Sequence, residues 1–139
     1  MPPVAVIEKI RAPAEDVFGF IGHVETHPQI ADFSQSVRII SEKKTGVGTR
    51  FHQVYTSGAE HISEMMVWEP YKKIVWHNFE GDSKTHVMII SYHFEEEGPY
   101  THVLHTVECD EYENQAKHRD GTLRNIRELA NLKRILEGE

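Results

Sequence analysis

The sequence predicts an α+β fold in which one curved antiparallel sheet of seven strands wraps around a long C-terminal helix, with two short helices between the first and second strands. Three observations support this prediction. Turn residues recur at short intervals along the chain. The segments between them are rich in β-branched and aromatic residues, which favour strands. The last two dozen residues repeat their apolar positions with a helical period. A length of 139 residues fits one domain, which we expect to span residues 1–139.

Turn signals delimit the strands, beginning with Gly46-Val47-Gly48 and ending with Gly98-Pro99. Their order along the chain predicts a meander of neighbouring antiparallel strands after the short helices. The predicted strands are Val4–Arg11, Val37–Lys44, Thr49–Thr56, His61–Glu69, Lys73–Phe79, Thr85–Glu95 and Thr101–Glu111.

Helix signals are clear at both ends of the chain. A first short helix begins near Pro13, because proline suits the first helical position and carboxylates follow it in the first turn. A second covers Pro28–Phe33, and the C-terminal helix covers Gln115–Leu136. Gly121 predicts either a kink or a helix that begins only near Asp120. The expected apolar stripe, with Glu128 on the polar side, consists of Leu123, Ile126, Leu129, Ala130, Leu132 and Leu136.

Composition excludes several classes of function. Fifteen Lys and Arg against 22 Asp and Glu give a net charge of −7, which repels nucleic acid. No apolar run is long enough to insert into a membrane. The single cysteine, Cys109, and the lack of an apolar leader indicate a cytoplasmic protein. The ten His have no metal-ligand spacing, so we expect no metal and no cofactor.

The predicted architecture leaves room for a ligand. Twisted sheets curl, and one helix is only about 10 Å wide. A seven-stranded sheet that wraps around it therefore leaves a gap on its concave side unless large side chains fill it.

Several segments resemble one superfamily. Ile7–Ile21 (IEKIRAPAEDVFGFI) is similar to the opening of START-like, or SRPBCC, proteins, especially the polyketide cyclase/dehydrase and lipid-transport branch. Gly46-Val47-Gly48-Thr49 resembles the second hairpin of these proteins. Similar matches are Glu69-Pro70, Lys73-Ile74-Val75-Trp76 and Asn131-Leu132-Lys133. The resemblance implies a helix-grip fold with an internal pocket for a hydrophobic small molecule. It implies no single reaction, because the superfamily includes carriers, cyclases, hormone receptors and chaperone co-activators.

The alternation of side chains along each strand predicts which residues face the pocket. In the last strand Val103, His105, Val107 and Cys109 share the inward face. In the fourth strand alternation favours neither face clearly, and the sixth strand is apolar on both faces, so the orientation of both stays open. The apolar faces of the sixth strand favour a partner subunit, a homodimer, on the convex side. We expect His105 to be neutral in an apolar enclosure. The candidate ligand-binding residues are His27, Phe33, Phe51, Tyr55, Met65, Trp76, Ser91, His93, Val103, His105, Leu123 and Ile126.

Three functions remain open. The first is binding or carriage of a lipid, isoprenoid or polyaromatic compound. The second is a cyclase or dehydratase in which His93 or His105 is the general acid or base, because cyclisation needs a base of pKa near 7 in an enclosed pocket. The third is an interaction module of the chaperone-activator kind that uses the convex surface.

Overall fold

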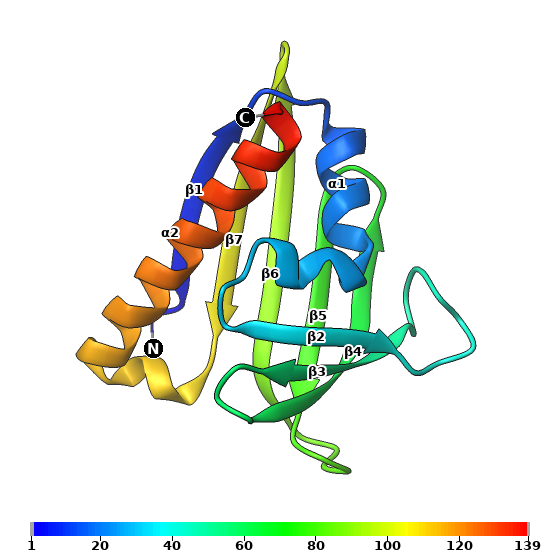
Figure 1. Ribbon diagram of the computed structural model, residues 1–139, viewed down its shortest axis with the longest axis vertical. Helices are drawn as coiled ribbons and strands as arrows, with labels where there is room; N and C mark the ends of the chain where they lie inside the picture. The colour runs from blue at the N-terminus through cyan, green and yellow to red at the C-terminus, as the bar shows by residue number, and fades with distance from the viewer. Residues whose placement is uncertain (1, 139) are drawn as a thin grey trace.

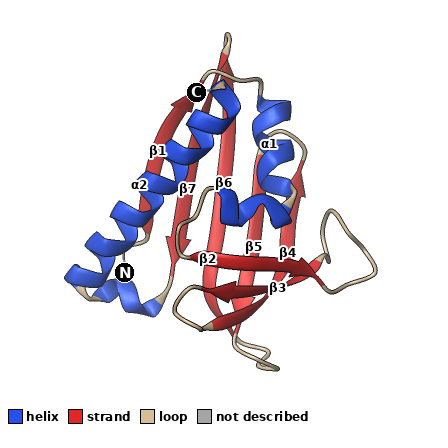
Figure 2. Ribbon diagram, viewed as in Figure 1, coloured by secondary structure: helices blue, strands red, loops and turns tan. Residues whose placement is uncertain are grey.

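The computed structural model describes residues 2–138 and contains one seven-stranded antiparallel sheet with the order β1-β7-β6-β5-β4-β3-β2 (Figure 1). β2 and β3 cross in front of the other strands, so the sheet curves strongly, and the helices lie on its concave side (Figure 2). The strands are β1 (Val4–Ile10), β2 (Ser34–Ile39), β3 (Arg50–Tyr55), β4 (Glu60–Glu69), β5 (Lys73–Phe79), β6 (His86–Glu97) and β7 (Tyr100–Glu108). The helices are α1 (Ala14–Gly22), α2 (Gln115–Glu137) and the 3-10 helices Val24–Gln29 and Asp110–Glu113.

The predicted α+β architecture is confirmed, with three local corrections. The second short helix is a 3-10 helix at Val24–Gln29 rather than a helix at Pro28–Phe33. β2 begins at Ser34, three residues before the predicted start, and the chain leaves it at Ile39. β7 ends at Glu108, because the chain turns into the 3-10 helix Asp110–Glu113 instead of remaining extended. Among residues 2–138, no helix is long and apolar enough to cross a membrane.

α1 packs its apolar face against the sheet. Pro13 precedes the helix in an extended conformation, and Glu15 and Asp16 occupy its positively polarised first turn. The ring of Phe18 meets Trp68 of β4 edge to face with centroids 4.9 Å apart. A Cβ on Gly22 would lie 2.6 Å from Trp68, so this close approach requires glycine.

α2 is one unbroken helix. The Asn114 side chain accepts a hydrogen bond from the Lys117 amide at 3.1 Å, which fixes the start of the helix well before Asp120. Gly121 causes no kink. A Cβ there would lie 2.9 Å from the Tyr112 ring, so glycine lets the second 3-10 helix pack directly against α2.

The predicted orientation of α2 is wrong in its first half. The buried positions are Gly121, Asn125, Glu128, Leu129 and Leu132. Leu123 and Ile126 are 48% and 47% exposed, and Glu128 is only 1% exposed. Apolar periodicity failed here because two polar residues and a glycine, rather than the leucines, face the concave side of the sheet.

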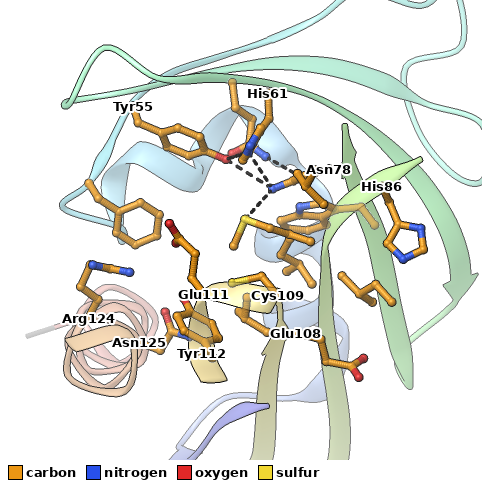
Figure 3. Close-up of a pocket in the computed structure, with 18 of the residues that line it drawn as sticks. Tyr55, His61, Asn78, His86, Glu108, Cys109, Glu111, Tyr112, Arg124 and Asn125 are labelled. Atoms are coloured by element: carbon orange, nitrogen blue, oxygen red, sulfur yellow. Dashed lines mark hydrogen bonds between the residues drawn. The ribbon is translucent and has the colours of Figure 1, made fainter. Parts of the chain in front are cut away.

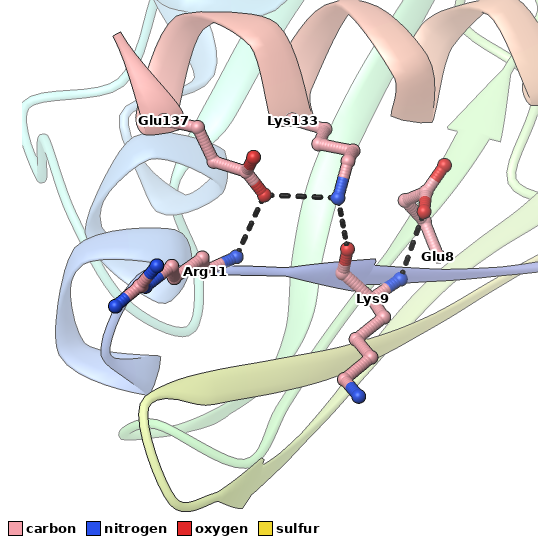
Figure 4. Close-up of polar contacts among 5 residues, drawn as sticks. All are labelled: Glu8, Lys9, Arg11, Lys133 and Glu137. Carbon is pink, nitrogen blue, oxygen red and sulfur yellow. Dashed lines mark hydrogen bonds and ion pairs between the residues drawn. The ribbon is translucent and has the colours of Figure 1, made fainter.

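The C-terminal end of α2 is fastened to β1 by polar contacts (Figure 4). The ammonium group of Lys133 donates to the Lys9 carbonyl at 2.8 Å. The Glu137 carboxylate accepts from the Arg11 amide at 2.8 Å and pairs with Lys133 at 2.9 Å. These bonds hold this end of the helix against the edge of the sheet.

Burial along the strands assigns the inward residues. β7 alternates as predicted, with Val103, His105 and Val107 buried. In β4 a bulge between Met65 and Val67 shifts the register, so Met65 is buried before the bulge and Trp68 packs on the core after it. In β6, Tyr92 is fully buried.

Candidate ligand-binding cavity

A cavity of about 1180 Å³ lies between α2 and the concave face of the sheet. Strands β3 to β7, both 3-10 helices and α2 contribute to its wall (Figure 3). Its aromatic lining comprises Phe33, Tyr55, Trp76, Tyr92 and Tyr112. This volume exceeds the usual upper range of about 1000 Å³ for small-molecule pockets, so a polycyclic molecule has room.

The structure brings five of the predicted residues to the cavity wall: His27, Phe33, Tyr55, Trp76 and His105. Phe51, Met65 and Val103 are buried in the core but do not line the cavity.

Four further candidates lie elsewhere. Ser91 and His93 alternate with Tyr92 and therefore face away from the cavity. Leu123 and Ile126 are on the exposed side of α2, because a different face of this helix from the predicted one packs on the sheet. The imidazole of His93 therefore does not face the cavity and cannot act on a molecule bound there.

A buried polar network joins the sheet to α2. Glu128 Oε2 accepts a hydrogen bond from the Tyr92 hydroxyl at 2.6 Å and lies 3.2 Å from His105 Nε2. The rings of Tyr92 and His105 stack with centroids 4.1 Å apart. Because a carbonyl only accepts, the 3.1 Å contact to the Ser91 oxygen requires a proton on His105 Nδ1. Both ring nitrogens of His105 are therefore engaged.

Glu128 is ionised within this network. Burial by itself raises the pKa of a carboxyl group, but His105, His27 and the Tyr92 hydroxyl outweigh that effect and hold the pKa of Glu128 at about 2. Glu128 Oε2 therefore accepts from the Tyr92 hydroxyl and faces His105 Nε2 as a carboxylate.

His27 adds an aromatic edge to the same end of the cavity. Its ring meets Trp76 edge to face at 5.8 Å. Burial lowers its pKa, with nearby Glu128 acting in the opposite direction. His27 is therefore neutral at physiological pH.

A second polar network crosses β3, β4 and β5. The Tyr55 hydroxyl lies 2.9 Å from His61 Nδ1, and the Asn78 amide donates to that hydroxyl at 3.3 Å. Ser63 donates to Asn78 Oδ1 at 2.6 Å, and Gln53 donates to Ser63 at 2.8 Å. These bonds fix the side chains that form this wall of the cavity.

The tautomer of His61 follows from this network. Burial lowers the pKa of His61 and raises that of Tyr55, so both are neutral at pH 7. The Asn78 amide nitrogen, which only donates, lies 3.3 Å from the Tyr55 oxygen and 3.4 Å from His61 Nδ1, so Nδ1 is an acceptor and the Tyr55 hydroxyl donates to it.

Sequence reasoning missed Gln53, Asn78, Asn125 and Glu128 as parts of this region. Two signals were present. Gly121, Asn125, Glu128 and Leu132 lie at helical spacing on one face. Ser63 and Asn78 are cross-strand partners, so the antiparallel register aligns polar residues of neighbouring strands.

Two donors on the cavity wall have no hydrogen-bond partner within residues 2–138: Trp76 Nε1 and Asn125 Nδ2. Trp76 is 2% exposed and Asn125 is 4% exposed. Because a buried unpaired donor costs about 1–3 kcal/mol, this end of the cavity favours a molecule that carries acceptor atoms.

Carboxylates dominate the outer part of the wall. Glu80, Glu108, Asp110 and Glu111 are all exposed and line the cavity, whereas Arg124 is the one Lys or Arg among the described lining residues. Arg124 lies 5.5 Å from the centroid of the Phe33 ring. Among residues 2–138, no group of three His, Cys, Asp or Glu is arranged to hold a metal ion.

Solved structures share this architecture. A di-domain ARO/CYC protein, BexL from the BE-7585A biosynthetic pathway, aligns over 99% of this chain and 47% of its own length, with a TM-score of 0.76 and 18% identity. The chain has the START-like, helix-grip fold. TTHA0849 from Thermus thermophilus is also similar, with a TM-score of 0.74, 19% identity and coverage of 99% of this chain and 98% of its own. DR_A0006 from Deinococcus radiodurans has a TM-score of 0.73, 16% identity and coverage of 99% of this chain and 100% of its own. No protein-family model and no curated protein matches the sequence.

Proposed function

We propose that this START-like protein binds a largely apolar, aromatic small molecule in the cavity beneath α2. The observation that carries the proposal is the cavity of about 1180 Å³, with its lining of five aromatic side chains. Aromatic walls with a few polar groups are typical of sites for small organic ligands. The same fold occurs in BexL, an ARO/CYC protein of a biosynthetic pathway, which supports a small organic ligand.

Binding has stronger support than acid–base catalysis. A general base needs a free lone pair directed at its substrate. In His105, Nδ1 donates to Ser91 and Nε2 faces Glu128. In His61, Nδ1 accepts from Tyr55. The polar networks therefore fix the shape of the wall, and a cyclase or dehydratase mechanism based on His105 or His61 would need its network to open.

The two tryptophans provide a direct test, because Trp76 lines the cavity and Trp68 does not. We expect a neutral tricyclic probe, 9-fluorenone, to shift the indole N–H signal of Trp76 in a ¹⁵N-correlated NMR spectrum. The signal of Trp68 should remain in place. Trp68→Phe assigns the two signals and leaves the cavity reporter intact.

Two results would count against binding in this cavity. One is an unchanged Trp76 signal at saturating 9-fluorenone, together with no thermal stabilisation. The other is an equal response of Trp68 and Trp76, which indicates non-specific adsorption to the protein.

A further inference from the structure

The polar groups at the inner end of the cavity reveal a property of the ligand. We infer that the ligand is an aromatic carbonyl compound without negative charge, whose oxygen accepts a hydrogen bond from Trp76 Nε1 or Asn125 Nδ2. This inference rests on the proposed function and narrows it to one chemical class.

The first argument is an excess of donors. An indole nitrogen can only donate, and Trp76 Nε1 and Asn125 Nδ2 both lack a partner in the described chain. The neighbouring acceptor, Glu128 Oε2, already receives the Tyr92 hydroxyl and faces His105. An acceptor from outside the described chain is therefore required to pair these donors.

The second argument is burial. Trp76 and Asn125 are more than nine-tenths buried and line the cavity from opposite sides, Trp76 from β5 and Asn125 from α2. A planar molecule between the sheet and the helix would meet both walls. A carbonyl group on an aromatic frame provides acceptor lone pairs without adding a donor that would need its own partner.

The third argument is charge. The four exposed carboxylates on the outer wall create a negative potential that only Arg124 opposes, because His61 is neutral. Glu128 adds an ionised carboxylate further in, paired with His105. This distribution repels fatty acids and other anions on entry, whereas neutral molecules pass.

Three matched probes test the inference by equilibrium dialysis. 9-Fluorenone carries the carbonyl, fluorene replaces it by a methylene group, and 9-fluorenone-2-carboxylate adds a negative charge. We expect fluorenone to bind about tenfold more tightly than fluorene, since donors that stay unpaired are costly. The carboxylate should bind at least fivefold more weakly than fluorenone at low salt, and this difference should shrink as salt increases.

Variants locate the effect. Asn125→Leu keeps the number and branching of the side-chain heavy atoms but removes the donor, and Trp76→Phe removes the indole N–H. We expect either change to reduce the preference for fluorenone over fluorene at least threefold. Ser34→Ala is the matched control, because Ser34 Oγ is also buried without a partner but does not line the cavity. This control should leave the preference unchanged.

The outcomes separate this inference from the proposed function. Equal affinities for fluorenone and fluorene overturn the inference and leave aromatic binding in place. Tighter binding of the carboxylate overturns the charge argument. A preference that survives both Trp76→Phe and Asn125→Leu places the acceptor elsewhere and also overturns the inference. Failure of all three probes to bind contradicts the proposed function itself.

Discussion

The two halves of α2 serve different purposes although they form one continuous helix. In the second half, Leu129 and Leu132 are fully buried, and Lys133 and Glu137 fasten the helix to β1. In the first half, the buried positions are a glycine, an amide and a carboxylate. The second half closes a core by apolar packing, whereas the first half forms the wall of a cavity and presents polar atoms to it.

This contrast shows how one helix both packs against a sheet and leaves space beneath itself. Gly121 lets the Tyr112 ring approach the backbone, and Asn125 lies on the cavity wall. Substitutions in the second half should therefore affect stability alone. Those in the first half should affect stability and the chemistry of the cavity together.

Leu132→Ala should have the largest effect on stability. Leu132 is completely buried, and removal of a fully packed leucine side chain costs about 4 kcal/mol through lost burial and the void that remains. Urea denaturation measures this change in the free energy of unfolding. Leu123→Ala, at a half-exposed position on the same helix, is the control and should cost much less. Equal effects at the two positions would contradict the orientation of α2.

Glu128→Gln should lower the free energy of unfolding by about 3 kcal/mol at pH 7, because it removes the buried carboxylate that accepts from Tyr92 and faces His105. The pKa of Glu128 is about 2 in the folded protein and 4.5 in its ordinary environment. As the pH falls, Glu128 is therefore protonated in the unfolded chain at a higher pH than in the folded protein. The stabilisation by Glu128 is therefore complete above pH 4.5 and is lost as the pH falls towards 2.

Chemical denaturation of both proteins at several pH values tests this linkage. The difference between wild type and Glu128→Gln should shrink steadily below pH 4.5. Glu95→Gln, on an exposed part of β6, is the control and should show a small difference throughout. A constant difference between pH 7 and pH 2 would exclude an ionised Glu128.

Gly121→Ala should have the smallest effect, a net loss of about 1 kcal/mol. The new Cβ would lie 2.9 Å from the Tyr112 ring. The resulting strain, of about 1–3 kcal/mol, exceeds the gain in helix propensity of about 1 kcal/mol. Gly19→Ala in α1 meets nothing within 4 Å and should instead stabilise the protein slightly, as thermal unfolding can show. Stabilisation by both substitutions would contradict the contact between Tyr112 and α2.

The order of the helices and strands could be predicted from the sequence. The face of α2 that packs against the sheet could not. Turn residues placed the strands, and alternation identified the inward face of β7, where Val103, His105 and Val107 are buried. In α2 the leucines at 123 and 129 belong to different faces, and the buried Glu128 resembles a solvated residue until its partners Tyr92 and His105 are known. Those partners come from distant strands, so local periodicity could not reveal them.

The fastening of α2 to β1 also affects the open edge of the sheet. β1 is a border strand of the open sheet, and such strands invite pairing with another chain through their unpaired backbone groups. The Lys9 carbonyl receives Lys133, the Lys9 amide donates to Glu8, and the Arg11 amide donates to Glu137. Side chains thus occupy three backbone groups that a strand of another chain would otherwise use for pairing.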